Sequence, residues 1–63
     1  MEILIAIMMY LGLLSPDAAN SMSDAEISGL INANATVIES VSNNAETYEA
    51  AAALEFMIDR RED

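Results

Sequence analysis

The strongest constraint on this chain is a nearly unbroken apolar run over residues 3–14, in a sequence of only 63 residues. A helix that crosses a membrane needs about 20 apolar residues, whereas this run ends at Ser15-Pro16-Asp17. A secretory signal peptide starts with basic residues, but this chain starts with Met1-Glu2. We therefore expect the run to be buried by protein and regard a membrane location as unlikely on these grounds.

The apolar run is compatible with either a helix or a strand. Its isoleucines favour a strand, and periodicity does not separate a short buried strand from a buried helix. Only residues 35–41 offer a second strand to pair with, and they fit a helix better. We prefer a helix over about 2–14, and the strand interpretation stays open at this stage.

Two further helices are predicted from their capping residues. Ser23-Asp24-Ala25-Glu26 has the Ser and Glu spacing of a capping box, which predicts a helix over about 24–42. Placed at 100° intervals, its apolar residues fall within an arc of about 120°. These residues are Ile27, Leu30, Ile31, Val37, Ile38 and Val41. Asn43-Asn44 predicts a stop, and Asn44 can cap a third helix over about 45–61.

Two shorter features lie in and between these helices. Ser15-Pro16-Asp17 has the residues of a helix start, and we expect a short helical turn through Ala19. Asn34 lies at the centre of the apolar arc of the second helix, where it is expected to fix a helix–helix contact; a local break is the alternative. The sequence thus predicts one all-α domain over residues 1–63, a compact three-helix arrangement with short connections.

Charge is the strongest global property of the chain. It has eleven Asp and Glu residues and two basic residues, for a net charge of −9. The basic residues are Arg60 and Arg61, which we expect to complement the C-terminal end of the third helix. The side chains of residues 1–59 therefore form no salt bridges among themselves. A basic protein surface is the expected partner; nucleic acid and anionic membranes are disfavoured, and acidity that serves solubility alone is the alternative.

The residues of most catalytic and metal sites are missing from the sequence. There is no Cys, His or Lys, which excludes the usual activated nucleophiles and the thiolate or imidazole metal sites. Neither a calcium-binding loop nor a glycine-rich phosphate loop is found. We expect a protein that is not an enzyme and has no cofactor or metal. The lack of Cys fits a cytoplasmic location.

The first predicted helix is apolar on every side. If one face packs against the other helices, a second apolar face remains exposed. Ile5, Met9 and Leu13 form a second stripe at helical spacing. We expect this stripe to be an interface, most simply of a homodimer, because exposing it would forgo roughly 1.5–3 kcal/mol for each side chain. The alternative is a first helix enclosed within the monomer.

The third predicted helix has aromatic and acidic residues on one face. Ala50, Leu54, Met57 and Ile58 group on the side that should face the core. The outward face is expected to bind the partner through Tyr48, Glu49, Glu55, Phe56, Asp59 and Asp63. Aromatic residues are common at binding hot spots, and acids around them attract a basic partner. The alternative is that Phe56 or Tyr48 packs against the first helix.

In its size, its lack of Cys and its acids from Asp24 to Asp63, the chain resembles the small acidic inhibitors carried by phages and mobile elements, such as anti-CRISPR proteins and DNA mimics. The resemblance implies stoichiometric inhibition, in which carboxylates occupy a basic channel meant for nucleic acid. Acids scattered thinly around a self-contained monomer, with no apolar ridge left exposed, would argue against a recognition protein of any kind. The competing hypothesis is an adaptor or assembly protein that docks through the apolar stripe.

Overall fold

The computed structural model describes residues 2–59, which form helices and no strands. The described helices are α1 (Glu2–Tyr10), α2 (Pro16–Ser21), α3 (Asp24–Ala33), α4 (Ala35–Ser42), α5 (Ala45–Ala52) and the 3₁₀ helix η1 (Glu55–Met57). The all-α prediction is confirmed for the described residues. The apolar run forms a helix, α1, as far as Tyr10. The prediction of three helices is wrong, because each of the three predicted helices ends early or is interrupted.

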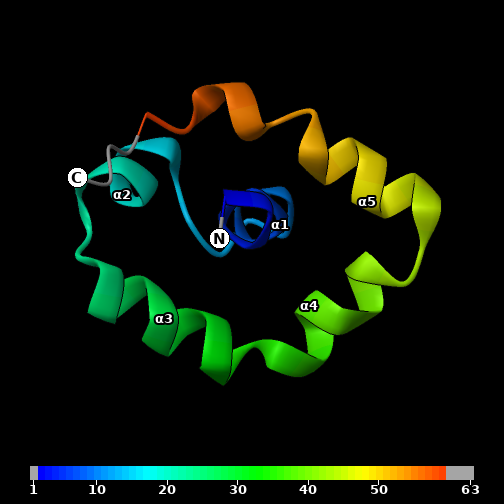
Figure 1. Cartoon of the computed structure of the whole chain (residues 1–63), viewed down its shortest axis with the longest axis horizontal. Helices are drawn as coiled ribbons and strands as arrows, with labels where there is room; N and C mark the ends of the chain where they lie inside the picture. The colour runs from blue at the N-terminus through cyan, green and yellow to red at the C-terminus, as the bar shows by residue number, and fades with distance from the viewer. Residues whose placement is uncertain (1, 60–63) are drawn as a thin grey trace.

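Helix α1 passes through the middle of the molecule. Figure 1 looks down α1, and the remaining helices follow one another around it in a ring. Helix α1 contacts every other helix of the described chain, and its contact with α5 is the most extensive. This arrangement accounts for an α1 that is apolar on all sides, since it has protein around its whole circumference.

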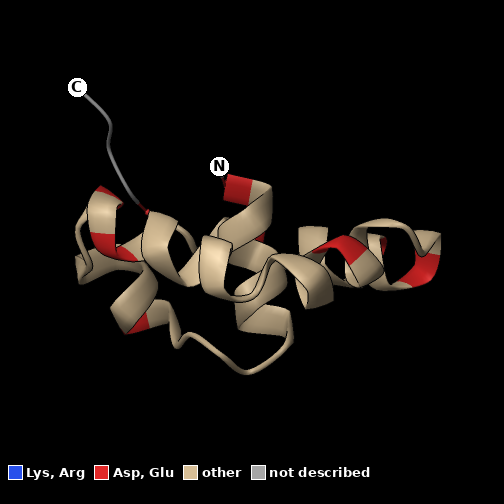
Figure 2. Cartoon of the chain, turned by 90° about the horizontal axis from the view of Figure 1, so that it is seen from below, with Lys and Arg blue, Asp and Glu red and all other residues tan. Residues whose placement is uncertain are grey.

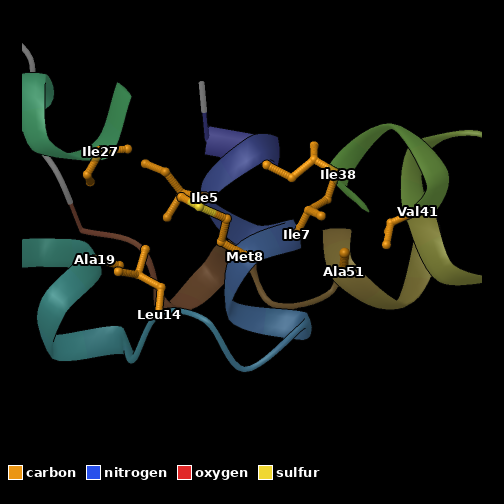
Figure 3. Close-up of a cluster of buried hydrophobic side chains, with 9 residues drawn as sticks. All are labelled: Ile5, Ile7, Met8, Leu14, Ala19, Ile27, Ile38, Val41 and Ala51. Carbon is orange, nitrogen blue, oxygen red and sulfur yellow. The ribbon is translucent and has the colours of Figure 1, made fainter. Parts of the chain in front are cut away.

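The core is built outward from α1. Ile5, Ile7 and Met8 are almost completely buried, and Figure 3 shows their side chains pointing toward different parts of the ring. The ring contributes buried residues from the loop after α1 and from four of its helices: Leu14, Ala19, Ile27, Ile38, Val41 and Ala51. Of the predicted arc of the second helix, Ile27, Ile38 and Val41 are thus confirmed as core residues, whereas Val37 is 39% exposed.

Helix α1 ends at Tyr10 and not at residue 14, because Gly12 reverses the chain. Gly12 has a φ of +77°, a conformation that other L-residues adopt only with strain. The Gly12 N–H donates to the Met9 carbonyl (3.0 Å) and the Leu13 N–H donates to the Met8 carbonyl (2.9 Å). This pair of hydrogen bonds is a Schellman motif, which satisfies carbonyls at the end of the helix.

The predicted helix starts are confirmed. The Ser15 side chain accepts a hydrogen bond from the Ala18 N–H, with Pro16 as the first residue of α2. Both hydrogen bonds of the capping box between Ser23 and Glu26 are present at the start of α3. The Asn44 side chain accepts from two backbone N–H groups at the start of α5.

Asn34 interrupts the predicted helix over 24–42. It lies between α3 and α4 as a turn residue, and its φ and ψ of −117° and 22° are not helical. Its side-chain Nδ2 donates to the Leu30 carbonyl (2.8 Å), so the amide is occupied locally. The expectation that Asn34 fixes a contact between helices is therefore wrong. The alternative, a local break that turns Asn34 to solvent, is correct for the break, but the residue stays half-buried. The break lets α3 and α4 follow the circumference of α1 (Figure 1).

The predicted helix over 45–61 is also shorter than expected. Helix α5 stops at Ala52, and after a turn the chain forms η1. The predicted core face is correct for Ile58, which packs against the core, and wrong for Ala50, which is exposed, and Met57, which is 39% exposed. Ala51, which was not predicted, is fully buried in the core. Leu54 and Ile58 are half-buried. The predicted roles of Arg60 and Arg61 lie outside the described residues.

The predicted apolar stripe on the first helix is not an exposed surface. Ile5 is only 1% exposed, Met9 is half-buried, and Leu13 follows the end of α1 and is 45% exposed. The prediction of a continuous exposed stripe is wrong, because the ring covers the side of α1 that was expected to be free. The enclosed helix is the correct alternative, and the homodimer through α1 loses the surface on which it was predicted.

Candidate functional site

The carboxylates are spread over the whole described chain. All acids except Glu62 and Asp63 lie within residues 2–59, and each of the six described helices carries at least one. Figure 2 shows them at both ends of the long axis and between, with no Lys or Arg in the described part. At most two acids belong to any one of the described helices, so none of these helices carries a long row of carboxylates. The acids are therefore scattered over the described part of the chain and are not gathered on one face.

The predicted acidic face is divided among separate segments. Tyr48 and Glu49 are on α5, Glu55 and Phe56 are on η1, and Asp59 follows η1. The break after Ala52 means that one helical repeat does not relate the two halves, so the prediction that they share one helix face is wrong. Asp63 lies outside the described residues. The outward position of the two aromatics agrees with the prediction: Tyr48 is 41% exposed and Phe56 is 80% exposed.

Phe56 is the most exposed large hydrophobic residue of the described chain. Full burial of a Phe side chain is worth roughly 1.5–3 kcal/mol, and a small domain has little stability to forgo. Because the ring is 80% exposed, the alternative in which Phe56 packs against α1 is wrong. The other large hydrophobic residues with substantial exposure are Tyr10, Leu13, Val37, Tyr48 and Met57, each between 39% and 45% exposed.

The backbone beside Phe56 is held in place by a residue from the far end of the ring. Asn20 of α2 donates a hydrogen bond from Nδ2 to the Met57 carbonyl (3.1 Å). The Asp59 N–H donates to Asn20 Oδ1 (2.6 Å). The side-chain amide of Asn20 thus forms hydrogen bonds to the backbone on both sides of residue 58. These bonds join α2 to the segment after η1 and so close the ring of helices around α1. We name this pair of hydrogen bonds the Asn20 clamp.

Asn20 was not predicted as a site residue. Its partners are 37 and 39 residues away in the sequence. Within its own segment, Asn20 looks like any polar residue near the end of a short helix. No local spacing could have found it, because only the closure of the ring brings α2 beside η1.

The capping box at the start of α3 changes the acidity of Glu26. The backbone N–H and then the hydroxyl of Ser23 hold the pKa of Glu26 below its usual 4.5, because both hydrogen bonds favour the charged form. The cause is the capping box of α3, so the shift is explained by helix capping and does not mark a reactive group.

Other kinds of site find little support in residues 2–59. No group of three or more acids there is placed to hold a metal ion. None of the helices in this range is both long and apolar enough to cross a bilayer. The polar and charged residues of the same range are all at least partly exposed. What the described surface offers is charge of one sign together with a few exposed apolar groups, which is the chemistry of a binding surface.

Comparison of the chain with protein-family models, with curated proteins and with solved structures finds no match.

Proposed function

We propose that this chain is a non-enzymatic inhibitor that binds the basic, nucleic-acid-binding surface of a partner protein in the cytoplasm. The observation that carries the proposal is the combination of a described surface, residues 2–59, that carries acids and no basic side chains with Phe56, which is 80% exposed. Acids on every helix attract a cationic partner from any direction, and exposed aromatic residues supply affinity at short range. The resemblance to anti-CRISPR proteins makes a CRISPR effector complex the first target to test.

The distribution of the acids changes the kind of mimicry we propose. Carboxylates spread over a ring do not reproduce the regular spacing of phosphates along one strand. They do compete with nucleic acid for the same cations, because the attraction depends on total charge and on the distance to the partner. Phe56 and Tyr48, with Glu49, Glu55 and Asp59, are the residues that we assign to the contact itself.

Two triple variants with the same charge separate contact from long-range attraction. The contact triple is Glu49→Gln, Glu55→Gln and Asp59→Asn; the control triple is Asp17→Asn, Glu39→Gln and Glu46→Gln. Each removes three negative charges, so the general attraction falls by the same amount. Inhibition of DNA binding by a purified effector complex should weaken in both and be lost only in the contact triple.

Salt provides the second part of this test. Raising NaCl from 50 to about 300 mM shortens the screening length and should weaken the complex by at least about ten-fold. An affinity that does not change with salt would contradict the proposal, and so would a contact triple that inhibits as well as the control triple.

The adaptor hypothesis is less well supported, because it required the apolar stripe on α1 to be free and Ile5 is buried. Leu13 is the one member of that stripe with substantial exposure. An adaptor would lose its partner in Leu13→Glu, whereas the proposed inhibitor would keep it.

A further inference from the structure

The turn that carries Phe56 has an ordered backbone. The Met57 N–H donates to the Leu54 carbonyl (3.0 Å), and the Ile58 N–H donates to the Glu55 carbonyl (3.0 Å). The Asn20 clamp then fixes residues 57 and 59. The half-buried Ile58 packs against the core, which anchors the same segment from within. Phe56 therefore projects from a backbone that is held by hydrogen bonds on both sides.

An exposed ring on an ordered backbone is suited to binding. A side chain on a mobile segment loses conformational freedom when it binds, and a side chain on a fixed turn loses less. The ring is 80% exposed, so nothing in the described part of the chain has to move before a partner can contact it. The fold thus presents Phe56 already in place for a partner.

Charge decides which kind of partner fits. A second copy of this chain would bring a net charge of −9 to a surface of the same sign, so self-association at Phe56 is opposed. A cationic partner is attracted instead. Glu55 precedes the ring directly and is half-buried, and Asp59 lies three residues beyond it and is exposed. The ring therefore has a carboxylate on either side in the sequence.

Sites for single-stranded nucleic acid have matching chemistry. They combine a cationic groove, which follows the phosphates, with aromatic or guanidinium faces on which successive bases stack. A flat, exposed ring with carboxylates before and after it in the sequence offers the same elements as one nucleotide and its flanking phosphates: a face for stacking, and negative charge along the chain on both sides.

We propose that Phe56 occupies a base-stacking position in a cationic, single-strand-binding site of the partner, with Glu55 and Asp59 taking the places of flanking phosphates. The inference rests on the proposed function, since it specifies the partner surface that the inhibitor blocks. The inference specifies that the partner binds the Phe56 ring by stacking. An aliphatic side chain at position 56 should therefore bind the partner less well than an aromatic ring does.

Two synthetic peptides with equal charge test the inference. The first probe is octalysine, which offers cations alone. The second contains eight lysines alternating with tryptophans, which offers cations together with stacking surfaces. Affinities are measured at low salt by titration calorimetry, and backbone amide shifts in NMR spectra locate the contact. Wild type should bind the tryptophan peptide at least about five-fold more tightly than octalysine, the lower end of what one stacked ring contributes. The largest shifts should fall in residues 54–59.

Variants at Phe56 separate stacking from hydrophobic contact. Phe56→Trp should keep the preference for the tryptophan peptide, whereas Phe56→Leu and Phe56→Ala should lose it and still bind octalysine as wild type does. Since the ring is exposed, these variants should fold, which circular dichroism checks. Val37→Ala on α4 and Tyr10→Leu on α1 are the matched controls; both side chains are exposed and neither is assigned to the contact, so both variants should keep the preference.

The outcomes distinguish the two proposals. If wild type binds neither peptide, attraction to cationic surfaces is absent and both proposals fail. If both peptides bind equally well, or if Phe56→Leu keeps the preference, the stacking inference fails and the proposed function stands. Dimer formation by wild type that is lost in Phe56→Ala would also overturn the inference, because the ring would then serve self-association.

Discussion

At the scale of single residues, the two glycines of the chain have opposite roles. Gly12 reverses the chain after α1 with a φ of +77°, while Gly29 is inside α3 with ordinary helical geometry. An added Cβ would meet nothing within 4 Å at either position. Any difference between alanine variants at these positions therefore reports backbone conformation and not a clash.

The first prediction compares these two alanine variants. Gly12→Ala should lower the free energy of unfolding by about 1–2 kcal/mol, because alanine is strained at positive φ. Gly29→Ala should raise it by about 0.5–1 kcal/mol, because alanine is the better helix former. Urea unfolding followed by circular dichroism measures both. Equal effects of the two substitutions would contradict the Schellman motif at the end of α1.

The second prediction concerns Glu26 and pH. Its pKa is lower in the folded chain than its usual 4.5, so its ionised form is favoured by folding. This contribution to stability is complete above the unfolded-state pKa and is lost as the pH falls through the lower folded-state pKa. Wild type should be more stable than Glu26→Gln at pH 7, and the difference should shrink steadily below about pH 4.5.

Thermal unfolding of both proteins between pH 7 and pH 3 measures this difference. The other carboxyl groups are the same in wild type and in Glu26→Gln, so the comparison isolates the capping box. A difference that grows as the pH falls would have the wrong sign and would contradict the hydrogen bonds between Ser23 and Glu26.

At the scale of helices, the starts could be predicted from the sequence and most of the ends could not. The side chains of Ser15, Ser23 and Asn44 accept hydrogen bonds from backbone N–H groups two or three residues further along the chain. Capping of this kind depends on neighbouring residues alone, so it can be predicted from the local sequence. The break at Asn34 is different. Apolar residues on both sides of it keep facing the same core whether the helix is continuous or bends, and periodicity does not separate these cases.

The same reasoning applies to the candidate site. The exposure of Tyr48 and Phe56 could be predicted, because acidic neighbours mark an outward surface. Their position on one helix could not, because strong helix formers at residues 50–53 suggested that α5 continues. The packing of Ala51 against α1 and the Asn20 clamp decide where that segment goes, and both depend on tertiary contacts.

The third prediction tests the Asn20 clamp. Asn20→Ala removes both of its hydrogen bonds to the backbone, each worth about 0.5–1.5 kcal/mol in net terms, and should lower the free energy of unfolding by about 1–2 kcal/mol. Hydrogen exchange should show that the Asp59 amide loses its protection. Amides in the middle of α1 exchange through global unfolding, so they should lose only the protection that corresponds to the lower free energy of unfolding.

Asn20→Asp is the matched variant for the clamp. It keeps an oxygen that can accept from the Asp59 N–H but places a carboxylate where Nδ2 donated to the Met57 carbonyl. Protection of the Asp59 amide should then lie between those of wild type and Asn20→Ala. If Asn20→Ala leaves that amide fully protected, the clamp does not hold the chain segment that carries Phe56.

At the scale of the whole molecule, the fold encloses its most apolar helix in a ring whose members all carry negative charge. Burial of α1 by a ring of helices stabilises the chain, and repulsion among the acids opposes it. The chain extends 30 × 24 × 20 Å, so many of its charges lie further apart than the screening length of about 8 Å at physiological salt. Repulsion is therefore weak at physiological salt and several-fold stronger in dilute buffer.

The last prediction follows from this balance. Added salt should stabilise the folded chain, because it screens repulsion among the acids, and should weaken binding to a basic partner. Raising NaCl from 10 to 150 mM should increase the melting temperature by on the order of 10 °C, since screening removes about 1–3 kcal/mol of repulsion from a domain of this size. The control triple with Asp17→Asn, Glu39→Gln and Glu46→Gln should show less than half of that increase, because pairwise repulsion scales roughly with the square of the net charge. Scanning calorimetry on both proteins measures it. A melting temperature that does not rise with salt would mean that the acids do not repel one another appreciably, and the one-sign surface on which the proposed binding depends would be too weak to attract a basic partner.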